Sequence, residues 1–119
     1  LHALIDAILG AAFMGDIGRL FPDTDPAFKD ASSLVLLERA WNAVKYRGYD
    51  FINADITVIC ERPKLAPHID KMEDNICNVL NISRERINIK ATTTEKLGFT
   101  GRGEGIAAEA VCILSCSPK

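Results

Sequence analysis

The sequence lacks the features that mark nucleic-acid-binding and membrane proteins. Its 14 Lys and Arg residues are outnumbered by 16 Asp and Glu residues, whereas domains that bind a phosphate backbone usually carry a basic excess. Aromatic residues make up only 7% of the chain, which is few for a protein that stacks bases. No run reaches the ~20 apolar residues needed to cross a bilayer, and no signal peptide is visible. We therefore expect a soluble cytoplasmic protein that binds no nucleic acid and no membrane.

Paired cysteine motifs are also absent. The four cysteines are Cys60, Cys77, Cys112 and Cys116, and their spacing fits neither a zinc ribbon nor a small disulfide framework. Cys112 and Cys116 are four residues apart in a predicted strand, which places both on one face. The pattern favours small buried thiols in a reducing compartment.

What is present is an alternation of amphipathic segments in one domain, residues 1–119, since a chain of this length encloses one core. Apolar residues recur with helical spacing over 1–13, 34–44 and 69–80, which predicts three helices. Asp30, Ser32 and Ser33 are candidate N-caps of the second helix, and Gly48 ends it. The Gly-, Pro- and Asp-rich residues 14–26 are predicted to form a loop.

Three later segments alternate with a period of two and predict strands. The first places Ile52, Ala54, Ile56, Val58 and Cys60 on one face; the second places Ile87, Ile89 and Ala91; the last places Ile106, Ala108, Ala110, Cys112 and Leu114. The element order predicts an α+β fold, a ferredoxin-like two-layer sandwich of helices on a mixed β-sheet. The first helix begins at Leu1 without a capping residue ahead of it, so we expect residues upstream of the sequence given.

Four segments are richer in polar residues or glycine than a fold alone requires. His2 and Asp6 are four residues apart, which places them on one helix face and suits a metal-binding imidazole beside a carboxylate. One histidine near a helix start is more often a surface residue, however, and a catalytic zinc takes at least three protein ligands.

Two loops have both a functional and a structural interpretation. Residues 15–18 and 21–25 hold three carboxylates that can accept hydrogen bonds from a polyol, although an acidic surface loop with Asx turns has the same composition. Residues 60–67 join a strand to a helix, a place where ligands commonly bind. They also fit a proline-rich connection with exposed charges.

The fourth segment, Lys90–Gly105, is the most informative. Three consecutive threonines, Glu95, Arg102 and several glycines follow the end of a predicted strand. Hydroxyls and Arg can bind phosphate oxygens, and a carboxylate can bind a divalent cation. A plain hairpin needs none of these, so the segment favours a functional site.

Five separated motifs together resemble the 2-C-methyl-D-erythritol 2,4-cyclodiphosphate synthase family. They are Leu1–Leu4, Gly15–Gly18, Phe21–Asp25, Pro63–His68 and Ala91–Gly105, and they occur in the family's order along the whole chain. The resemblance implies a homotrimer with active sites at subunit boundaries. It also implies a substrate, 4-diphosphocytidyl-2-C-methyl-D-erythritol 2-phosphate, whose 2-phosphate attacks the β-phosphorus to close a ring and release CMP.

The resemblance assigns roles to individual residues. Thr93 and Glu95 are the implied catalytic residues, His2 the implied zinc ligand, and Glu95 the implied ligand of a magnesium or manganese ion. Residues 16–18 and 21–25 should bind the methylerythritol, residues 60–66 the cytosine, and residues 92–95 the phosphates. The full set of implied substrate-binding residues is Asp16, Ile17, Gly18, Phe21, Pro22, Asp23, Thr24, Asp25, Cys60, Glu61, Arg62, Pro63, Lys64, Leu65, Ala66, Thr92, Thr93, Thr94, Glu95, Phe99 and Arg102.

The sequence departs from the family at its start. The family's other two zinc ligands, an Asp and a His, lie on a strand that would precede Leu1, so we expect the chain as given to be inactive alone. Arg102 and Glu104 are implied to lie near the trimer axis, where a cavity can hold an isoprenoid diphosphate. The alternative function is an inactive trimeric module that binds a cytidine nucleotide or an isoprenoid diphosphate. A plastid-type organelle is the expected location in a eukaryote.

Overall fold

The computed structural model describes residues 1–21, 32–61 and 66–116. Its elements are α1 (His2–Ala11), α2 (Ile17–Leu20), α3 (Ser33–Tyr46), β1 (Tyr49–Ile59), η2 (Ala66–His68), α4 (Ile69–Leu80), η3 (Arg84–Arg86), β2 (Ile87–Thr92), α5 (Gly98–Gly101) and β3 (Ala107–Cys116). Within these described ranges no helix is long and apolar enough to span a membrane.

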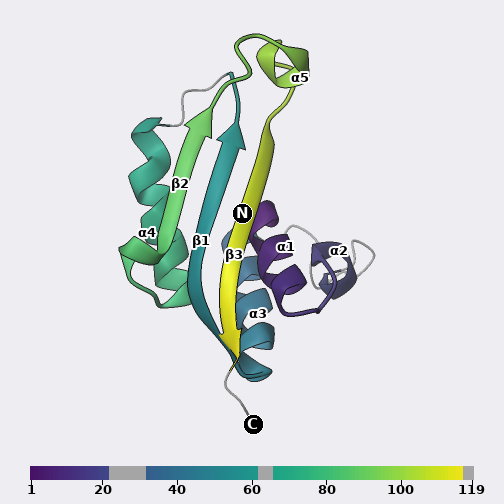
Figure 1. The fold of residues 1–119 in the computed structure, drawn as a ribbon, viewed down its shortest axis with the longest axis vertical. Helices are drawn as coiled ribbons and strands as arrows, with labels where there is room; N and C mark the ends of the chain where they lie inside the picture. Colours follow the sequence, from purple (N-terminus) through teal and green to yellow (C-terminus); the bar gives the residue numbers. More distant parts are fainter. Residues whose placement is uncertain (22–31, 62–65, 117–119) are drawn as a thin grey trace.

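The three strands form one mixed sheet in the order β2-β1-β3. β1 runs parallel to β2, to which α4 makes the crossover, and antiparallel to β3. Helices α1, α3 and α4 lie on one side of the sheet, and α5 lies beyond its far end (Figure 1). The predicted arrangement of helices on a mixed sheet is confirmed.

The core lies between the helices and the sheet. Four α1 side chains, Leu4, Ile5, Ile8 and Leu9, are completely buried, so the middle of the helical stripe predicted for residues 1–13 is confirmed. Its ends are wrong: Leu1 is 40% exposed, and Phe13, which follows the end of α1 with a positive φ, is 93% exposed. Burial of each such side chain contributes about 1.5–3 kcal/mol. The α3 stripe is buried too, and it begins after an N-cap at Ser32, whose hydroxyl accepts the Val35 N–H at 3.2 Å.

The sheet corrects two parts of the predicted alternation. Ile52 was predicted to share a buried face with Ala54, but it is 42% exposed while Phe51 is 3% exposed. The cause is a β-bulge: Phe51 pairs with Leu114 and Asn53 with Ile113, which leaves Ile52 as an extra residue. Ile106 was predicted to belong to the last strand, but it precedes β3 and is exposed.

The loop and cysteine predictions also need correction. Residues 17–20 of the predicted loop form the short helix α2, because Asp16 supplies an N-cap. Cys77 is buried and Cys112 half-buried, as expected for small hydrophobic thiols, but Cys116 at the end of β3 is exposed. Burial raises the pKa of the Cys112 and Cys77 thiols.

A buried carboxylate joins α4 to the edge of the sheet. Glu73 is 8% exposed; its Oε2 accepts the Ile89 N–H at 3.0 Å, and its Oε1 accepts from Arg84 Nη2 at 2.8 Å. Because both oxygens have partners, the charge can be buried without a large desolvation penalty. The bonds fix the position of β2, whose far end leads into the polar segment predicted to be functional.

Candidate functional site

The predicted site residues fall into two groups in different parts of the molecule. The helical group comprises His2 and residues 16–18 and 21, on or beside α1 and α2. The strand-end group comprises residues 60–61, 92–95, 99 and 102, which follow β1 and β2 and continue through α5. Figure 1 shows α2 beside α1 at the side of the sheet and α5 beyond the strand ends, so one chain does not bring the two groups together.

In the helical group, two carboxylates order the backbone around α2. Asp6 Oδ1 accepts the Ile17 N–H at 2.7 Å, and Asp16 Oδ1 accepts the Arg19 N–H at 2.9 Å. Asp16 is exposed and Gly18 lies next to it, so both remain accessible to a polar ligand. Phe21 is only 7% exposed and packs into the core.

His2 is exposed at the start of α1, where its Nε2 lies 3.4 Å from Ser33 Oγ. Asp6, predicted to lie beside the imidazole, instead bonds to the backbone of Ile17. Within the described part of the chain, no three His, Cys, Asp or Glu side chains are grouped as a metal site would require. His2 alone does not fit a zinc site, which takes at least three protein ligands, and we derive no step through zinc.

The strand-end group begins where β1 and β2 finish side by side. The Cys60 N–H donates to Thr92 O at 3.0 Å, which fixes the two segments to each other. Glu61 follows at once; its Oε2 is buried and has no hydrogen-bond partner within the described residues. A buried carboxylate oxygen without a partner is costly, so this oxygen is suited to accept from a bound donor.

After Thr92 the chain makes a tight turn with unusual backbone angles. Glu95 and Lys96 have φ of 53° and 69°, and the Leu97 N–H donates to Thr94 O at 3.1 Å. Positive φ at both central residues with this bond is typical of a type I′ turn, which normally uses Asn-Gly. Two consecutive non-glycine residues in this region are strained, and such strain clusters at functional sites.

The three threonines differ in their hydrogen bonds. Thr93 Oγ1 accepts the Glu95 N–H at 3.2 Å, so its own proton stays available for a ligand. Thr94 Oγ1 instead donates to Leu97 O and lies 3.1 Å from Thr100 Oγ1. Among the described residues, Thr92 Oγ1 makes only a long contact of 3.4 Å, with Thr93 O. Thr93 therefore has the best-placed free hydroxyl of the three.

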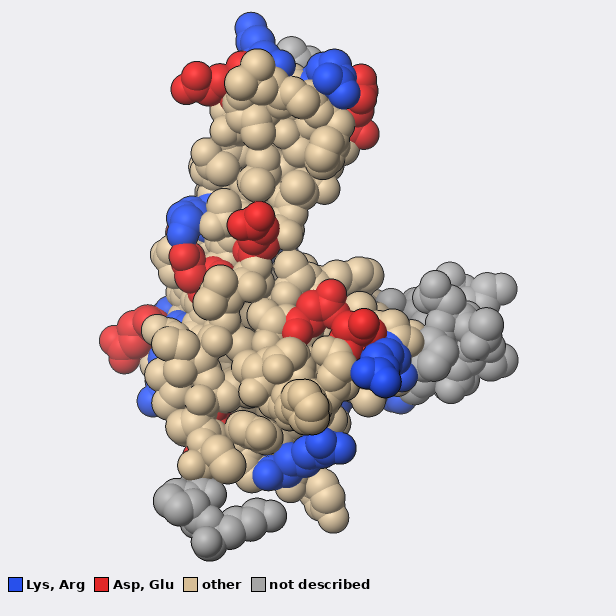
Figure 2. Space-filling model, turned by 45° about the vertical axis from the view of Figure 1, so that its right-hand side comes forward, with Lys and Arg blue, Asp and Glu red and all other residues tan. Residues whose placement is uncertain are grey.

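The exposed end of this group carries both signs of charge. Arg102 Nε and Nη2 contact Glu104 Oε1 and Oε2 at 2.8 and 3.2 Å, and Glu95, Lys96 and Phe99 are exposed nearby in the sequence. Figure 2 shows acidic and basic side chains together at the α5 end of the molecule. The exposed carboxylate of Glu95 is an oxygen donor that fits a magnesium or manganese ion shared with phosphate oxygens.

Sequence reasoning missed one polar residue of this group. Thr100 is 4% exposed and contacts Thr94. A hydroxyl within the run Gly98–Gly105 has no periodic pattern to mark its burial, and neither composition nor spacing signals it.

Some predicted residues cannot be placed. Pro22, Asp23, Thr24, Asp25, Arg62, Pro63, Lys64 and Leu65 lie outside the described residues. Ala66, the last residue of the predicted cytosine segment, is exposed at the start of η2.

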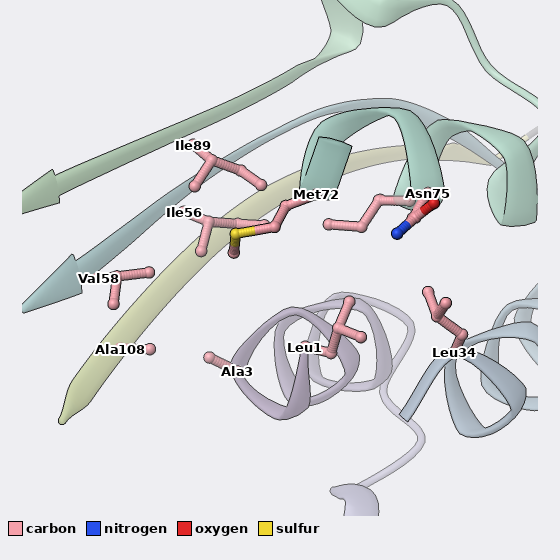
Figure 3. A pocket seen from close by; sticks show the side chains of 10 residues that line it. Leu1, Ala3, Leu34, Ile56, Val58, Met72, Asn75, Ile89 and Ala108 are labelled. Atoms are coloured by element: carbon pink, nitrogen blue, oxygen red, sulfur yellow. The ribbon is translucent and has the colours of Figure 1, made fainter. Parts of the chain in front are cut away.

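An apolar hollow of about 150 Å³ lies between the helices and the sheet. In Figure 3 the side chains of Met72, Ile56 and Ile89 face those of Leu1 and Leu34 across it. Asn75 is the one polar side chain among the described residues that line it. The hollow offers hydrocarbon contact and lacks the several polar groups that a phosphate-bearing ligand requires.

Comparisons with known proteins agree on one family. The profile of the YgbB family matches residues 1–115. Proteins named 2-C-methyl-D-erythritol 2,4-cyclodiphosphate synthase are 61% identical over 115 residues in Haemophilus ducreyi and 60% identical over 114 residues in Cronobacter sakazakii. The alignments cover 97% and 96% of this chain and 72% of each relative.

Solved structures share the fold. The bifunctional IspDF of Campylobacter jejuni is 50% identical with a TM-score of 0.93, and the alignment covers 98% of this chain and 31% of that one. IspF of Plasmodium falciparum, in a CDP complex, is 35% identical with a TM-score of 0.84, and the alignment covers 98% of this chain and 70% of that one.

Proposed function

Because this chain belongs to the YgbB family of 2-C-methyl-D-erythritol 2,4-cyclodiphosphate synthases, we propose that the protein carrying it is such a synthase. Its substrate is 4-diphosphocytidyl-2-C-methyl-D-erythritol 2-phosphate. An oxygen of the 2-phosphate bonds to the β-phosphorus, the bond from that phosphorus to the CMP oxygen breaks, and CMP leaves. The observation that carries the proposal is the strained Thr93–Lys96 turn, which presents a free hydroxyl and a carboxylate, in a chain 61% identical to a named synthase.

The turn suits the demands of this phosphoryl transfer. The two phosphate groups repel each other, so the site must hold them together and stabilise the charge that develops on the equatorial oxygens. Thr93, whose proton is not committed within the turn, donates to a phosphate oxygen in the transition state. Arg102 follows α5; two of its five N–H donors are directed at Glu104, and the others are available to a phosphate oxygen.

Glu95 is the proposed ligand of a magnesium or manganese ion. Such an ion commonly binds through one or two carboxylates together with substrate phosphates, and when bound it neutralises phosphate charge. The Glu95 carboxylate is exposed, and the left-handed backbone at Glu95 and Lys96 fixes where it leaves the chain. The residue therefore presents an oxygen donor in a defined direction.

The cytosine is proposed to bind after β1. The relative from Plasmodium falciparum is described as a CDP complex, and the segment that begins at Cys60 lies against Thr92. Glu61 directly follows Cys60, and its buried Oε2, which has no partner among the described residues, is an available acceptor. The nucleotide thus lies next to the turn that handles its phosphates.

We also propose that the protein is a homotrimer of ferredoxin-like protomers, with each active site shared by two copies. The helical and strand-end groups are apart within one chain (Figure 1), so a complete site needs a second copy. In addition, Val111 and Ile113 of β3 are 71% and 55% exposed, and apolar side chains on a bare strand suit burial against another copy. Light scattering of the purified protein tests this: a monomer at working concentration contradicts it.

The activity is tested by measuring CMP release by the full-length protein with magnesium present. Thr93→Ala should lower kcat about 100-fold, the usual cost of losing one transition-state hydrogen-bond donor. Glu95→Ala removes the proposed metal ligand, and with it charge stabilisation worth several kcal/mol, so it should lower kcat at least as much. Glu38→Ala is the control, since Glu38 is an exposed glutamate on α3 and its loss should leave kcat unchanged. CDP binding by calorimetry without any CMP release would instead favour the binding module over the enzyme.

A further inference from the structure

We propose that Thr100 is a positioning residue: its buried hydroxyl acts through Thr94 to hold the turn that presents Thr93 and Glu95. The inference rests on the proposed function, since it assigns the turn a role in turnover. Thr100 is only 4% exposed, so its side chain is covered by protein and is not presented to a ligand.

The directions of the hydrogen bonds follow from counting protons. A threonine hydroxyl has one proton to donate and two lone pairs that accept. Thr94 Oγ1 donates its proton to Leu97 O. The 3.1 Å contact between Thr94 Oγ1 and Thr100 Oγ1 therefore has Thr100 as its donor. The result is a directed chain from the Thr100 hydroxyl to the Thr94 hydroxyl to the Leu97 carbonyl.

This chain joins both ends of the strained turn. Thr94 and Leu97 are its first and last residues, already linked by the Leu97 N–H to Thr94 O bond at 3.1 Å. The side-chain bond from Thr94 closes a second link between the same two residues. Thr100 orients that second link from beneath, so the turn has two connections that oppose relaxation of Glu95 and Lys96 toward negative φ.

The neighbouring residue reinforces the same placement. A Cβ at Gly101 would lie 2.1 Å from the Lys96 carbonyl carbon and 2.5 Å from its Cα. The Lys96 backbone thus packs directly on Gly101, one residue after Thr100. The turn therefore packs against α5: Gly101 makes the close backbone contact, and Thr100 makes the hydrogen bond.

These bonds give Thr93 and Thr94 different roles. Thr94 has committed its proton to Leu97 O, so it has none to offer a phosphate, whereas Thr93 has one. Thr93 is therefore the threonine that can bind a ligand, and Thr94 is the one that holds the turn. Thr100 supports this division by donating its proton to Thr94 Oγ1.

The test compares Thr100→Val, which keeps the shape and removes the hydroxyl, with Thr100→Ser, which keeps the hydroxyl. CMP release by the full-length protein is measured over a range of substrate concentrations. Misplacing transition-state donors lowers kcat more than it raises KM, so Thr100→Val should lose about ten-fold or more in kcat with KM within about two-fold. Thr100→Ser should restore kcat to within about three-fold of the parent. Equal kcat in Thr100→Val and the parent, or equal losses in both variants, overturns the proposal.

A second measurement does not depend on activity. Hydrogen exchange of the Leu97 amide, which bonds to Thr94 O, should be at least ten-fold faster in Thr100→Val, while the Cys60 amide, bonded to Thr92 O, keeps its rate. An unchanged Leu97 rate contradicts the positioning role even if Thr100→Val is slow. If the parent protein releases no CMP, the proposed function fails, and the exchange rates still decide whether Thr100 holds the turn.

Discussion

The two polar groups of the candidate site are ordered in opposite ways. Around α2, Asp6 and Asp16 accept the backbone N–H groups of a helix start at 2.7 and 2.9 Å, an arrangement that short carboxylates favour. At the strand ends, Glu95 and Lys96 adopt left-handed φ values that their side chains disfavour. The first group is stabilised by its own sequence, whereas the second depends on residues packed beneath it.

This difference predicts where substitutions are tolerated. A locally stable segment survives the loss of one bond, because its neighbours still prefer the same conformation. A strained turn relaxes when its support is removed, since each left-handed residue costs about 1–2 kcal/mol. The strand-end group should therefore be the more sensitive of the two to changes in residues that never contact a ligand.

The largest effect is expected from Gly101→Ala. The added methyl group would lie 2.1 Å from the Lys96 carbonyl carbon, a contact with backbone that no side-chain rotation relieves. We expect a loss of about 2–3 kcal/mol in the free energy of unfolding, as for other overpacked sites, and a large fall in CMP release. Urea unfolding at one fixed protein concentration measures the first effect.

Gly10→Ala is the matched control. Gly10 lies in α1, and a Cβ there meets nothing within 4 Å. Because alanine favours a helix over glycine by about 1 kcal/mol, Gly10→Ala should stabilise the protein or leave it unchanged. If both alanine variants have the same unfolding midpoint, the turn is not supported by Gly101 and the comparison fails.

The sequence predicted a functional role for the strand-end group but not the way its turn is held. Three threonines followed by Glu95 predict a phosphate and cation site by residue type alone, and that role stays a prediction. The positive φ values of Glu95 and Lys96 cannot be predicted from the sequence, because neither residue type favours them. Gly101 is one glycine among several, and the contact of Gly101 with Lys96 is a tertiary contact that residue spacing does not encode.

In the fold, too, local patterns could be predicted from the sequence, whereas tertiary contacts could not. The α1 and α3 stripes were predictable, since buried helix faces repeat every three to four residues. The bulge at Ile52 was not, because an apolar residue continues the expected alternation across it while the pairing shifts. Likewise, Glu73 is one of several acidic residues on α4 that contact Arg84, and only its burial and its bond to the Ile89 N–H distinguish it.

A moderate effect is expected from Asp6→Ala in the helical group. The change removes the acceptor of the Ile17 N–H, and the loss of such a capping bond costs about 1 kcal/mol. Because Asp16 still caps α2, the fold and CMP release should persist, with kcat within about three-fold of the parent. Asp6→Asn keeps an acceptor oxygen and should recover most of the lost stability in urea unfolding. A loss as large as that of Gly101→Ala would reverse the ranking of the two groups.

A smaller effect of opposite sign is expected from Lys96→Gly. Glycine adopts a φ of 69° without steric cost, which outweighs its greater entropy in the unfolded chain. The net gain should be about 0.5 kcal/mol. Lys71→Gly, at an exposed position within α4, should instead lose about 1 kcal/mol. Destabilisation of similar size at both positions would show that Lys96 bears no strain.

The smallest effect tests whether surface charge contributes to holding the strand ends. Asp55 of β1 bonds to Lys90 and, at 3.0 Å, to Asn88 of β2, and the Lys90 bond is the main cause that lowers the pKa of the Asp55 carboxyl below its usual value. A lowered pKa in the folded state means that the unfolded chain binds more protons as the pH falls, so this contribution is present above about pH 4 and is lost as the pH drops through the folded pKa. Because the pair is exposed, Asp55→Asn should cost less than about 0.5 kcal/mol at pH 7, and its unfolding curve should converge with that of the parent at lower pH.

The Leu97 amide should exchange at the parent rate throughout, because the turn is held by Thr100 and Gly101. Faster exchange of that amide in Asp55→Asn would mean that the strained turn depends on the charge of the sheet below it.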